Sequence, residues 1–557
     1  MKLLSFGVEN YKVFKEMFEI ELSENNIVIL TGRNNTGKST ILEAINRFYQ
    51  NESRAKTIPN NCFSDSQKSI VMQANFTHNE EVIFIKKVYT NDKAPTFQDQ
   101  EGNDIKKGHD LFPYLEKIFE NKPFYITPSM LPEDIQGLIQ DIYKEIIGST
   151  LNNLNSVDDG NEELAELKIE YDRVKDAYPK FFKKIKDNTD AKLNEVSENV
   201  TANLQSLFSS KHLGLKVIGG ESLGFSSQDI LKTTTSVIEI ADDKKEQMPL
   251  ENQGTGLQRM SLIFLIQNMI KNGLLGEQTN KLLLIDEPEA FLHPEAIRAL
   301  SNSLYEIGVE MPLIISTHSP ILIDLSRQHS LIQVFRVNEN RAIELYQTGK
   351  AQFNPNDFQN LKILNYADSY VNEFFFAKEI LIVEGDTEYI IFKHLSKKYG
   401  INLHIIRARG KDTIVTLMKI LNQFDTSYKV LHDVDNNLSY EVSTLRSQKT
   451  KCRTIYDHKI NTTKSSDIEI YVSKANFEQA VGIGDISDYK KTRFAFDLVQ
   501  EKLGDGVYKT AFLKVEDLFK VMYMDALKFE LNHGFTKVNS LELFDELFDD
   551  LIVEVTS

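Results

Sequence analysis

Short apolar runs recur along this 557-residue chain, and most of them end in a polar turn that leads into a helix-like segment. The clearest runs are IVIL (27–30), LLLI (282–285), LIIS (313–316), ILIV (380–383) and YKVLH (428–432). Continuous apolar runs of this length are typical of strands buried on both faces, and their alternation with helices indicates parallel sheets. The pattern therefore predicts an α/β fold with functional loops at the carboxyl ends of the strands.

The segment 133–207 has a different pattern. Residues 161–208 combine dense charge with apolar residues at three-to-four spacing, which predicts long amphipathic helices. Two such helices with one apolar stripe need a partner surface, so we expect a dimerisation element. The alternative is a helical cap that lies on its own domain.

The first turn fits the phosphate-binding pattern G-x-x-x-x-G-K-[ST], between an apolar strand and a helix. Its residues are Gly32, Arg33, Asn34, Asn35, Thr36, Gly37, Lys38 and Ser39, followed by Thr40. Glycines let backbone N–H groups and the helix N-terminus face the phosphates of a nucleotide. Lys38 would contact those phosphates and Ser39 would ligate Mg²⁺. We expect Asn35 and Thr40 to belong to the same ATP site.

Three later segments complete this expected nucleotide site. The run at 282–285 ends in Asp286, which would hold Mg²⁺, and Glu287, which would polarise the attacking water. The run at 313–316 leads to His318, placed to sense the γ-phosphate. Between P-loop and Asp286, the glycines Gly254 and Gly256 open an apolar helix.

This order of motifs resembles the ABC-type ATPase heads of the SMC, RecF and Rad50 proteins. In such heads a signature segment reaches across a dimer to the partner's nucleotide. The present chain departs from the usual signature L-S-G-G-Q and carries QGTGLQR at 253–259 instead. The resemblance implies an ABC-type head, and the departure leaves open whether two heads enclose the nucleotide.

A second group of acids follows later strands. Glu384 and Glu388 flank the turn after ILIV, and Asp433 and Asp435 follow the strand at 428–432. Because the carboxyl ends of parallel strands share one edge, Glu384, Asp433 and Asp435 are expected to converge. Clustered carboxylates without His or Cys suit Mg²⁺ or Mn²⁺, and two such ions stabilise both oxygens of an in-line phosphodiester cleavage.

The E-G and D-x-D elements resemble the TOPRIM domain of topoisomerases, primases and OLD nucleases. The resemblance implies that Glu388 and Glu478, the latter in IYVSKANFEQAVG (470–482), hold a second metal ion. It also implies a late catalytic lysine, for which Lys509 is our candidate, with Lys514 as the second choice.

An ABC-type head with a helical insert, followed by a TOPRIM domain, resembles the OLD family, including the Gabija A endonucleases of anti-phage defence. We expect an ATPase domain at 1–132 and 208–365, interrupted by the insert at 133–207, and a TOPRIM domain with a helical extension at 366–557. The resemblance implies a metal-dependent DNA endonuclease governed by ATP, a homodimer or homotetramer, and a helicase-like companion. In Gabija-like proteins nucleotide is thought to restrain cleavage.

Composition limits the alternatives. The net charge of −17 argues against a general coat for nucleic acid, although it leaves room for a nuclease with a local basic strip. One such strip lies at 446–464, and a solvated loop or a contact to the DNA backbone explains it equally well. Two separated cysteines and the lack of a signal-peptide pattern or a long apolar stretch favour a cytoplasmic protein without membrane contact.

Two rival functions remain. The first is a DNA-repair or partner-recruiting ATPase of SMC or RecF type, whose TOPRIM domain does not cleave. The second is a topoisomerase or primase, which would need a strand-transfer tyrosine domain or a polymerising module. The chain leaves no room for either of those additions.

Overall fold

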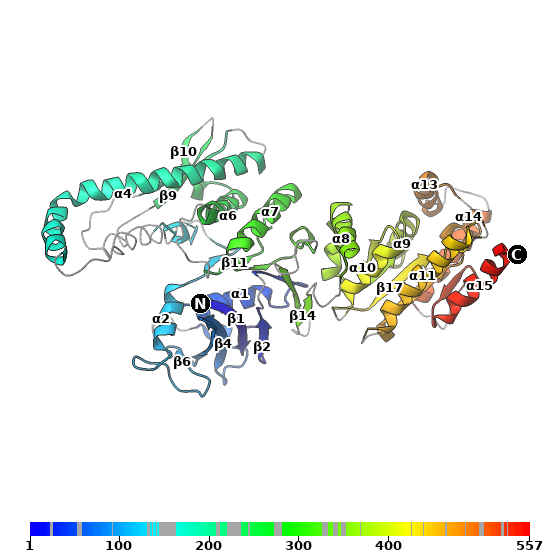
Figure 1. Ribbon diagram of the computed structural model, residues 1–557, viewed down its shortest axis with the longest axis horizontal. Coiled ribbons are helices and arrows are strands. Elements are labelled where there is room, and N and C mark those ends of the chain that lie inside the picture. Colours follow the sequence, from blue (N-terminus) through cyan, green and yellow to red (C-terminus); the bar gives the residue numbers. More distant parts are fainter. Residues whose placement is uncertain are drawn as a thin grey trace. The chain divides into compact units, whose positions relative to one another are not determined.

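The computed structural model divides into two compact units, which are described separately (Figure 1). The first unit comprises Met1–Leu322, Ser330–Gln333 and Val337–Ala342, and the second comprises Ile323–His329, Val334–Arg336 and Ile343–Ser557. The structure describes residues 1–556 except for 23–25, 53–57, 92, 131–133, 136, 141, 144–162, 208–211, 220–235, 243–244, 272–280, 326–331, 338–342, 347–352, 368, 425, 438, 463–464, 485, 501–505, 525–528 and 532.

The first unit contains an antiparallel sheet of order β2-β1-β4-β5-β6. Its strands are β1 (Lys2–Glu9), β2 (Phe18–Glu21), β4 (Ile70–His78), β5 (Glu81–Tyr89) and β6 (Thr96–Gln98). Buried and partly exposed residues alternate along β4 and β5, as expected for a sheet with one face on a core. Helix α2 (Phe112–Glu120) follows β6 along the chain.

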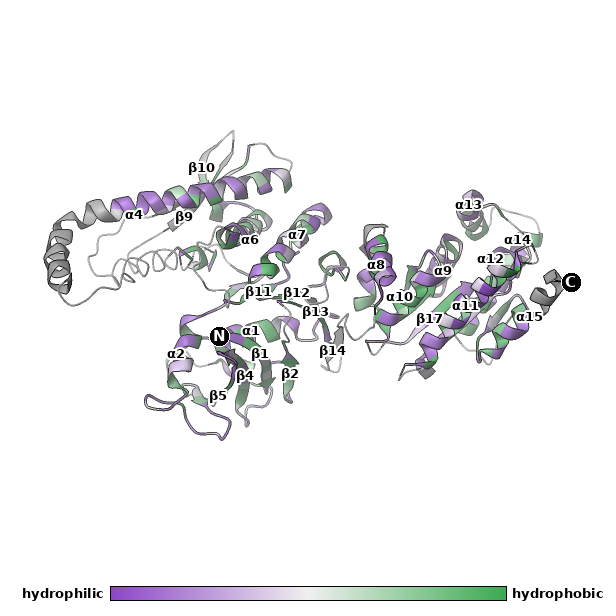
Figure 2. Ribbon diagram, viewed as in Figure 1, coloured by the Kyte–Doolittle hydropathy of each residue, from purple (hydrophilic) through white to green (hydrophobic). Residues whose placement is uncertain are grey.

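A parallel sheet carries the phosphate-binding turn. It contains β3 (Ile27–Thr31), β12 (Leu313–Ser316), β11 (Leu283–Asp286) and β7 (Phe124–Ile126), paired in that order. All residues of β3, β11 and β12 are buried, which matches their continuous apolar sequence and their green colour in Figure 2. The helices next to these strands in the chain are α1 (Lys38–Phe48) and α7 (Pro294–Glu310).

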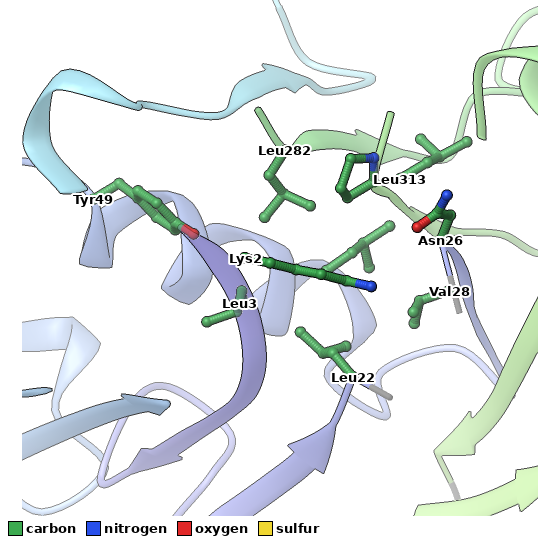
Figure 3. A pocket seen from close by; sticks show the side chains of 10 residues that line it. Lys2, Leu3, Leu22, Asn26, Val28, Tyr49, Leu282 and Leu313 are labelled. Carbon is green, nitrogen blue, oxygen red and sulfur yellow. The ribbon is translucent and has the colours of Figure 1, made fainter. Parts of the chain in front are cut away.

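The two sheets leave only a small cavity where they approach each other (Figure 3). Its volume is about 20 Å³, and its lining includes Leu3 of β1, Val28 of β3 and Leu313 of β12. This is room for about one water molecule, so the cavity is a packing defect of the core and not a ligand site.

Helix α4 (Glu163–Leu207) forms most of the described part of the expected insert. Its C-terminal third buries Leu193, Val196, Val200 and Leu204, and Thr201 Oγ1 accepts a hydrogen bond of 2.8 Å from the Leu215 N–H on β8 (Gly214–Gly219). Strands β9 (Ser236–Asp242) and β10 (Lys245–Pro249) continue that sheet. This part of α4 therefore lies on its own domain, and dimerisation through the insert stays a prediction.

The second unit has a sheet of order β16-β15-β17-β18-β19, in which the first four strands are parallel and β19 is antiparallel. The strands are β15 (Glu379–Val383), β16 (Leu403–Arg407), β17 (Tyr428–Asp433), β18 (Ile468–Ser473) and β19 (Phe535–Lys537). The helices are α8 (Pro355–Ala367), α9 (Asp386–Tyr399), α10 (Lys411–Leu421), α11 (Val442–Ile460), α12 (Phe477–Ala480), α13 (Asp488–Val499), α14 (Gly506–Tyr523) and α15 (Glu542–Thr556).

One face of this sheet packs on α9, α13 and α14. Leu381 and Leu431 from the strands meet Phe392 of α9 and Phe519 of α14, and all four side chains are fully buried. The rings of Phe392 and Phe519 lie 5.9 Å apart.

Strands β13 (Ile332–Val337) and β14 (Ile343–Tyr346) precede α8 along the chain.

Two features of the second half of the chain differ from the simplest interpretation of its sequence. Asp357 of α8, within the range 208–365 expected for the ATPase domain, accepts hydrogen bonds from Thr416 and Lys419 of α10, both at 2.7 Å, and belongs to the second unit. The domain boundary at 365 stays a prediction. The basic strip at 446–464 is not a loop, because most of it forms α11. Among the described helices, none is long and apolar enough to cross a membrane.

We predict that Gly534→Ala destabilises the second unit by about 1–3 kcal/mol, because overpacking at a rigid contact has this cost. A Cβ at Gly534 would lie 2.1 Å from the backbone oxygen of Ala480. The control is Gly506→Ala at the start of α14, where a Cβ would meet no atom within 4 Å. Calorimetric unfolding of the two variants measures the difference, and equal stability of both would contradict the prediction.

Candidate functional site

The turn between β3 and α1 has the backbone shape that its glycines permit. Gly32 has a φ of 129°, and a Cβ there would lie 2.4 Å from the Val337 carbonyl oxygen. Gly37 has a φ of 107° and packs against Phe14. Asn35 also has a positive φ, 62°, which asparagine tolerates better than most residues. The sequence thus folds into the wrapped turn that the motif predicts.

Lys38 is buried at the start of α1. Its Nζ donates hydrogen bonds to the carbonyl oxygens of Gly32, at 3.0 Å, and Arg33, at 2.8 Å. Burial lowers the pKa of Lys38 to about 8, and the nearby carboxylates of Glu287 and Asp286 oppose this shift. A lysine held inside its own turn offers a positive charge to an anion that enters there.

Asp286 at the end of β11 lies next to two hydroxyl groups. It accepts hydrogen bonds from Ser316 of β12 and from Ser39 of α1. Burial raises the pKa of Asp286, while these hydroxyls and Lys38 act in the opposite direction. The structure therefore brings the predicted Ser39 and Asp286 together, the pair that Mg²⁺ would use. Thr40 follows Ser39 in the first turn of α1.

Glu287 and His318 lie side by side after the neighbouring strands. Glu287 adopts a φ of 45°, and its N–H donates to the Ser316 carbonyl oxygen at 3.0 Å. His318 Nε2 lies 3.8 Å from Glu287 Oε1. Burial and the Lys38 charge lower the pKa of His318 to about 4, so its ring is neutral at pH 7 and can accept or donate a hydrogen bond.

Glu289 is a site residue that the sequence analysis missed. Its Oε1 accepts hydrogen bonds from Thr317 Oγ1, at 2.8 Å, and from the His318 N–H, at 2.7 Å. Burial raises the pKa of Glu289. The third acid in DEPEA (286–290) was the available signal. Glu289 fixes the backbone that carries His318.

The signature glycines lie at the start of α6 (Thr255–Lys271). A Cβ at Gly254 would meet no atom within 4 Å, whereas one at Gly256 would lie 3.0 Å from the Phe291 carbonyl oxygen. Arg259 is 3% exposed and stacks on the Phe291 ring at 5.1 Å. Its two terminal nitrogens have no hydrogen-bond partner among the described residues.

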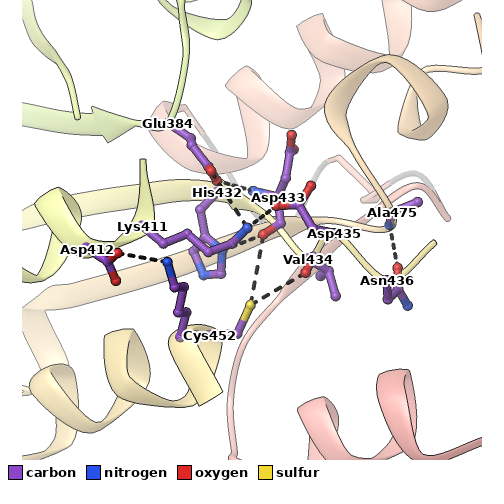
Figure 4. Close-up of polar contacts among 11 residues, drawn as sticks. Glu384, Lys411, Asp412, His432, Asp433, Val434, Asp435, Asn436, Cys452 and Ala475 are labelled. Carbon is purple, nitrogen blue, oxygen red and sulfur yellow. Dashed lines mark hydrogen bonds and ion pairs between the residues drawn. The ribbon is translucent and has the colours of Figure 1, made fainter. Parts of the chain in front are cut away.

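The second group of acids gathers at the carboxyl edge of the parallel sheet in the second unit (Figure 4). Glu384 follows β15, Asp433 ends β17, and Asp435 lies two residues further on. Glu384 Oε2 accepts a hydrogen bond of 3.0 Å from the Asp433 N–H. Asp435 has a φ of 58°, and its N–H donates to the Ala475 carbonyl oxygen at 2.7 Å, which turns the loop over the strand ends.

Lys411 lies between two of these acids, and the sequence analysis did not assign it a role. Its Nζ is 3.7 Å from Glu384 Oε1 and forms an ion pair with Asp435 Oδ2. The side chain is only 3% exposed. Figure 4 shows the chain of Lys411 reaching from α10 to both carboxylates. The pair Gly410-Lys411 after β16 was the available signal.

Glu388 and Glu478 form a second group next to the first. Glu478 begins the short helix α12, where Oε1 accepts from Thr387 Oγ1 at 3.2 Å and Oε2 lies 3.6 Å from Lys491 Nζ. Burial, followed by the charges of Glu384 and Glu478, raises the pKa of Glu388 to about 8. Glu388 therefore lies close enough to Glu384 of the first group, and to Glu478 of its own group, for both charges to raise its pKa.

Asp433 links the two groups. Burial raises its pKa well above the usual range, and the charges of Glu388 and Glu384 add to this effect. Asp433 Oδ1 is buried and has no hydrogen-bond partner within the described part of the chain. A buried carboxylate oxygen without a partner is costly, which points to a cation that completes its environment.

The expected two-metal site at these carboxylates stays a prediction. Among the described residues, no group of three or more His, Cys, Asp or Glu side chains is arranged to hold a metal ion. The physical reason at the first group is the Lys411 ammonium, which takes the inner oxygens of Glu384 and Asp435. In kind, however, the donors suit a hard divalent ion, because all are carboxylates.

A cavity of about 430 Å³ opens beside the first group of acids. Its lining includes Glu384, Asp435 and Lys411, together with Arg409 and Lys451. Arg409 has a φ of 60° and an exposed side chain, and Lys451 pairs with Asp412 at 2.8 Å. The cavity thus has Glu384 and Asp435 on its more buried side, and Arg409, Lys451 and the acid Asp412 at its exposed rim.

The structure separates the two candidate lysines on α14. Lys509 is exposed, whereas a Cβ at Gly482, just after α12, would lie 3.0 Å from Lys514 Nζ. Lys514 therefore lies on the side of α14 that faces the loop following Glu478. Our first choice, Lys509, has the weaker geometric support of the two.

Part of the basic strip is already paired with acids of the same unit. On α11, Lys449 lies 2.9 Å from Asp545 and 2.5 Å from Asp549, and Arg453 lies 2.5 Å from Asp545. These two cations are thus partly neutralised by α15, and the strip offers less charge to DNA than its sequence indicates.

Two protein families match different parts of the chain. Residues 27–324 match the family described as "AAA domain, putative AbiEii toxin, Type IV TA system". Residues 375–435 match the family described as "Overcoming lysogenization defect protein-like, TOPRIM domain". The predicted α/β organisation, a P-loop ATPase domain followed by a TOPRIM domain, is thereby confirmed.

Two curated relatives are named for nuclease activity. The Old nuclease of Escherichia phage P2 is 28% identical over 306 residues, which cover 49% of this chain and 50% of the relative. The OLD nuclease of Thermus scotoductus is 24% identical over 301 residues, covering 49% of this chain and 56% of the relative. The chain thus spans about half the length of the curated relatives it matches.

A solved Smc head domain with an extended coiled coil from Pyrococcus furiosus aligns at 16% identity with a TM-score of 0.39, covering 66% of this chain and 99% of that one.

We predict that Glu388→Gln stabilises the protein at pH 8 but not at pH 5 when divalent ions are chelated. The folded-state pKa of Glu388, about 8, lies above the model-peptide value of 4.5, so ionisation on unfolding lowers stability as the pH rises between these values. Glutamine cannot ionise, which removes a cost of roughly 4 kcal/mol at pH 8. Calorimetric unfolding at both pH values in EDTA checks this, and the same effect at both would contradict it.

Proposed function

We propose that this chain is a metal-dependent DNA endonuclease governed by nucleotide. The premise is that the chain belongs to the AAA-domain family described as a putative AbiEii toxin of a type IV TA system, and that it carries an OLD-like TOPRIM domain. The observation that carries the proposal is the convergence of Glu384, Asp433 and Asp435 at one sheet edge. The names of the two OLD nuclease relatives support the same activity.

Residues of two groups would hold the divalent ions. Glu384, Asp433 and Asp435 would hold the first, and Glu388 and Glu478 the second. When bound, Mg²⁺ or Mn²⁺ would polarise the phosphodiester and lower the pKa of a water molecule. Two observations support this role. Asp433 Oδ1 has no hydrogen-bond partner among the described residues, and burial together with nearby negative charge raises the pKa of Glu388, so nearby lysines compensate both carboxyl groups only in part.

The chain's own residues would position the DNA. The 430 Å³ cavity places Arg409 and Lys451 at the rim of the acidic base, where each could contact a backbone phosphate. Lys514, or our first choice Lys509, would stabilise charge that develops on the leaving oxygen. Duplex DNA as substrate, and nicking or double-strand cleavage as the outcome, belong to this proposal.

The first unit would bind ATP with Mg²⁺. Lys38 would contact the phosphates, Ser39 and Asp286 would share the ion, and Glu287 with the neutral His318 would orient water at the γ-phosphate. The hydrogen bond between Ser39 and Asp286 and the 3.8 Å approach of His318 to Glu287 support these roles. We extend the proposal to assembly as a homodimer or homotetramer and to a role in anti-phage defence with a helicase-like companion.

One observation favours the alternative of a non-cleaving ATPase of repair type. The Lys411 ammonium already neutralises Glu384 and Asp435, as a purely structural ion pair would. The nuclease needs the acids of the second unit, whereas the non-cleaving ATPase needs only the nucleotide site. Single substitutions at the two sites therefore distinguish the two functions.

We propose that Glu384 either holds the first ion or acts as the base that activates the reacting water. We expect Glu384→Ala to reduce plasmid cleavage with Mg²⁺ or Mn²⁺ by roughly 100-fold or more, because general-base catalysis contributes at least this much. Binding of a fluorescent ATP analogue should stay unchanged. Lys38→Ala is the matched control and should show the opposite pattern for nucleotide binding. Undiminished cleavage by Glu384→Ala would reject the assignment and favour the non-cleaving alternative.

We further expect millimolar ATP to suppress cleavage by the wild-type protein, as the resemblance to Gabija A endonucleases implies. The same ATP concentrations should have little effect on Lys38→Ala, because this variant lacks the amine that would contact the phosphates. Cleavage is followed over a series of ATP concentrations at constant free Mg²⁺. Stimulation of the wild type by ATP would reject this form of regulation.

A further inference from the structure

Lys411 is unusual because of where its charge lies. It is the first residue of α10, whose N-cap, Gly410, provides no side-chain hydrogen bond. The N-terminus of a helix carries partial positive charge, so a lysine there is unfavourable unless acids compensate it. Here the amine is almost completely buried, and burial of an unpaired ammonium would be costly. The acids that face it therefore hold it in place.

The contacts of Lys411 use the oxygens that a cation would need. Glu384 Oε2 is engaged by the Asp433 N–H, which leaves Oε1 as the inner oxygen, and this atom lies 3.7 Å from Lys411 Nζ. The Asp435 oxygen that faces the same region, Oδ2, is paired with the same amine. A cation bound by Glu384 and Asp435 would thus have to take the place of the ammonium.

We propose that Lys411 is a built-in counter-ion that competes with divalent cations for Glu384 and Asp435 and so sets the metal affinity of the site. This inference rests on the proposed metal-dependent function. Lys411 is a positioning residue in this account, since it acts through the two carboxylates.

The surroundings of Lys411 leave its amine a place to move. The same side chain lines the 430 Å³ cavity together with Arg409, Gln448 and Lys451. An ammonium displaced from the acids can therefore turn into this cavity without leaving the unit. There it would join the cations at the rim, where the proposed function places a DNA phosphate. Displacement would thus couple metal entry to a gain of positive charge on the substrate side.

The Lys411 ammonium and a divalent ion would compensate the carboxylates Glu384, Asp433 and Asp435 to different degrees. With the ammonium in place, Glu384 and Asp435 are compensated but Asp433 Oδ1 keeps no partner among the described residues. A divalent ion could satisfy all three carboxylates, since it carries twice the charge and accepts several oxygen ligands. The competition is therefore a balance and not a permanent block.

The test measures Mn²⁺ binding to the full-length protein without nucleotide, by the electron paramagnetic resonance signal of free Mn²⁺. Lys411→Met should lower the Kd for Mn²⁺ at least ten-fold relative to the wild type, and it should lower the Tm in EDTA. Lys451→Met removes the same charge from the rim of the same cavity and should change the Kd less than three-fold. The double variant Glu384→Gln, Lys411→Met should lose the gain, which assigns it to this site.

The outcomes separate the inference from the proposed function. If the wild type binds Mn²⁺ and Glu384→Gln weakens binding, but Lys411→Met leaves the Kd unchanged, the competition is refuted while the metal site stands. If neither the wild type nor Lys411→Met binds Mn²⁺, both the proposed function and the inference are overturned. Lys411→Gln is measured in parallel, so that poor folding of the methionine variant does not decide the result.

Discussion

Mutual repulsion among buried carboxylates is the constraint on which the second unit depends. Two unit charges about 4 Å apart interact by roughly 4 kcal/mol at an effective dielectric constant of about 20. The fold places Glu384, Glu388, Asp433 and Asp435 within reach of one another, and burial, reinforced by the neighbouring negative charges, raises the pKa of Glu388 and of Asp433. One ammonium, from Lys411, compensates only part of this charge. A chain that keeps such an arrangement needs a further cation, which is the physical basis of the proposed metal site.

In the first unit the groups that face the proposed ligand are positive. The P-loop contains backbone N–H groups and the buried Lys38, whose pKa is lowered by burial, and these groups favour binding of an anion. Asp286 and Glu287 lie opposite, each fixed by Ser316. An anion and its magnesium ion would satisfy both sides at once. We propose that each unit holds a charge imbalance that a ligand would compensate, a phosphate in the first unit and a divalent ion in the second.

Much of this could be predicted from the sequence, because the determinants are local. The glycines at 32 and 37 need positive φ, and the apolar runs before Asp286, Glu384 and Asp433 form strands of parallel sheets. The strands before Glu384 and Asp433 pair with each other, so their ends share an edge. The strands thus carry their acids to the expected places. Sequence patterns of this kind fix which edge a residue reaches, but not which atoms it meets there.

What could not be predicted depends on contacts between distant residues. Lys411 meets Asp435 across 24 positions, and Lys449 meets Asp549 across 100. Nothing in the local pattern distinguishes these lysines from solvated ones. The helix α11 was also not foreseen. Its buried residues, Leu445, Cys452, Ile455 and Tyr456, have helical spacing, but charged and polar residues outnumber them in this segment of 19 residues. Lys514 reaches the loop after α12 only through the packing of α14.

The central claim is that carboxylates from two strand ends, those of β15 and β17, share a hard cation, and anomalous diffraction from crystals soaked in Mn²⁺ tests it most directly. The account predicts an anomalous peak bounded by Glu384, Asp433 and Asp435, with the Lys411 amine moved away from it. Crystals that show no peak there, and a Lys411 amine still paired with Glu384 and Asp435, would contradict it.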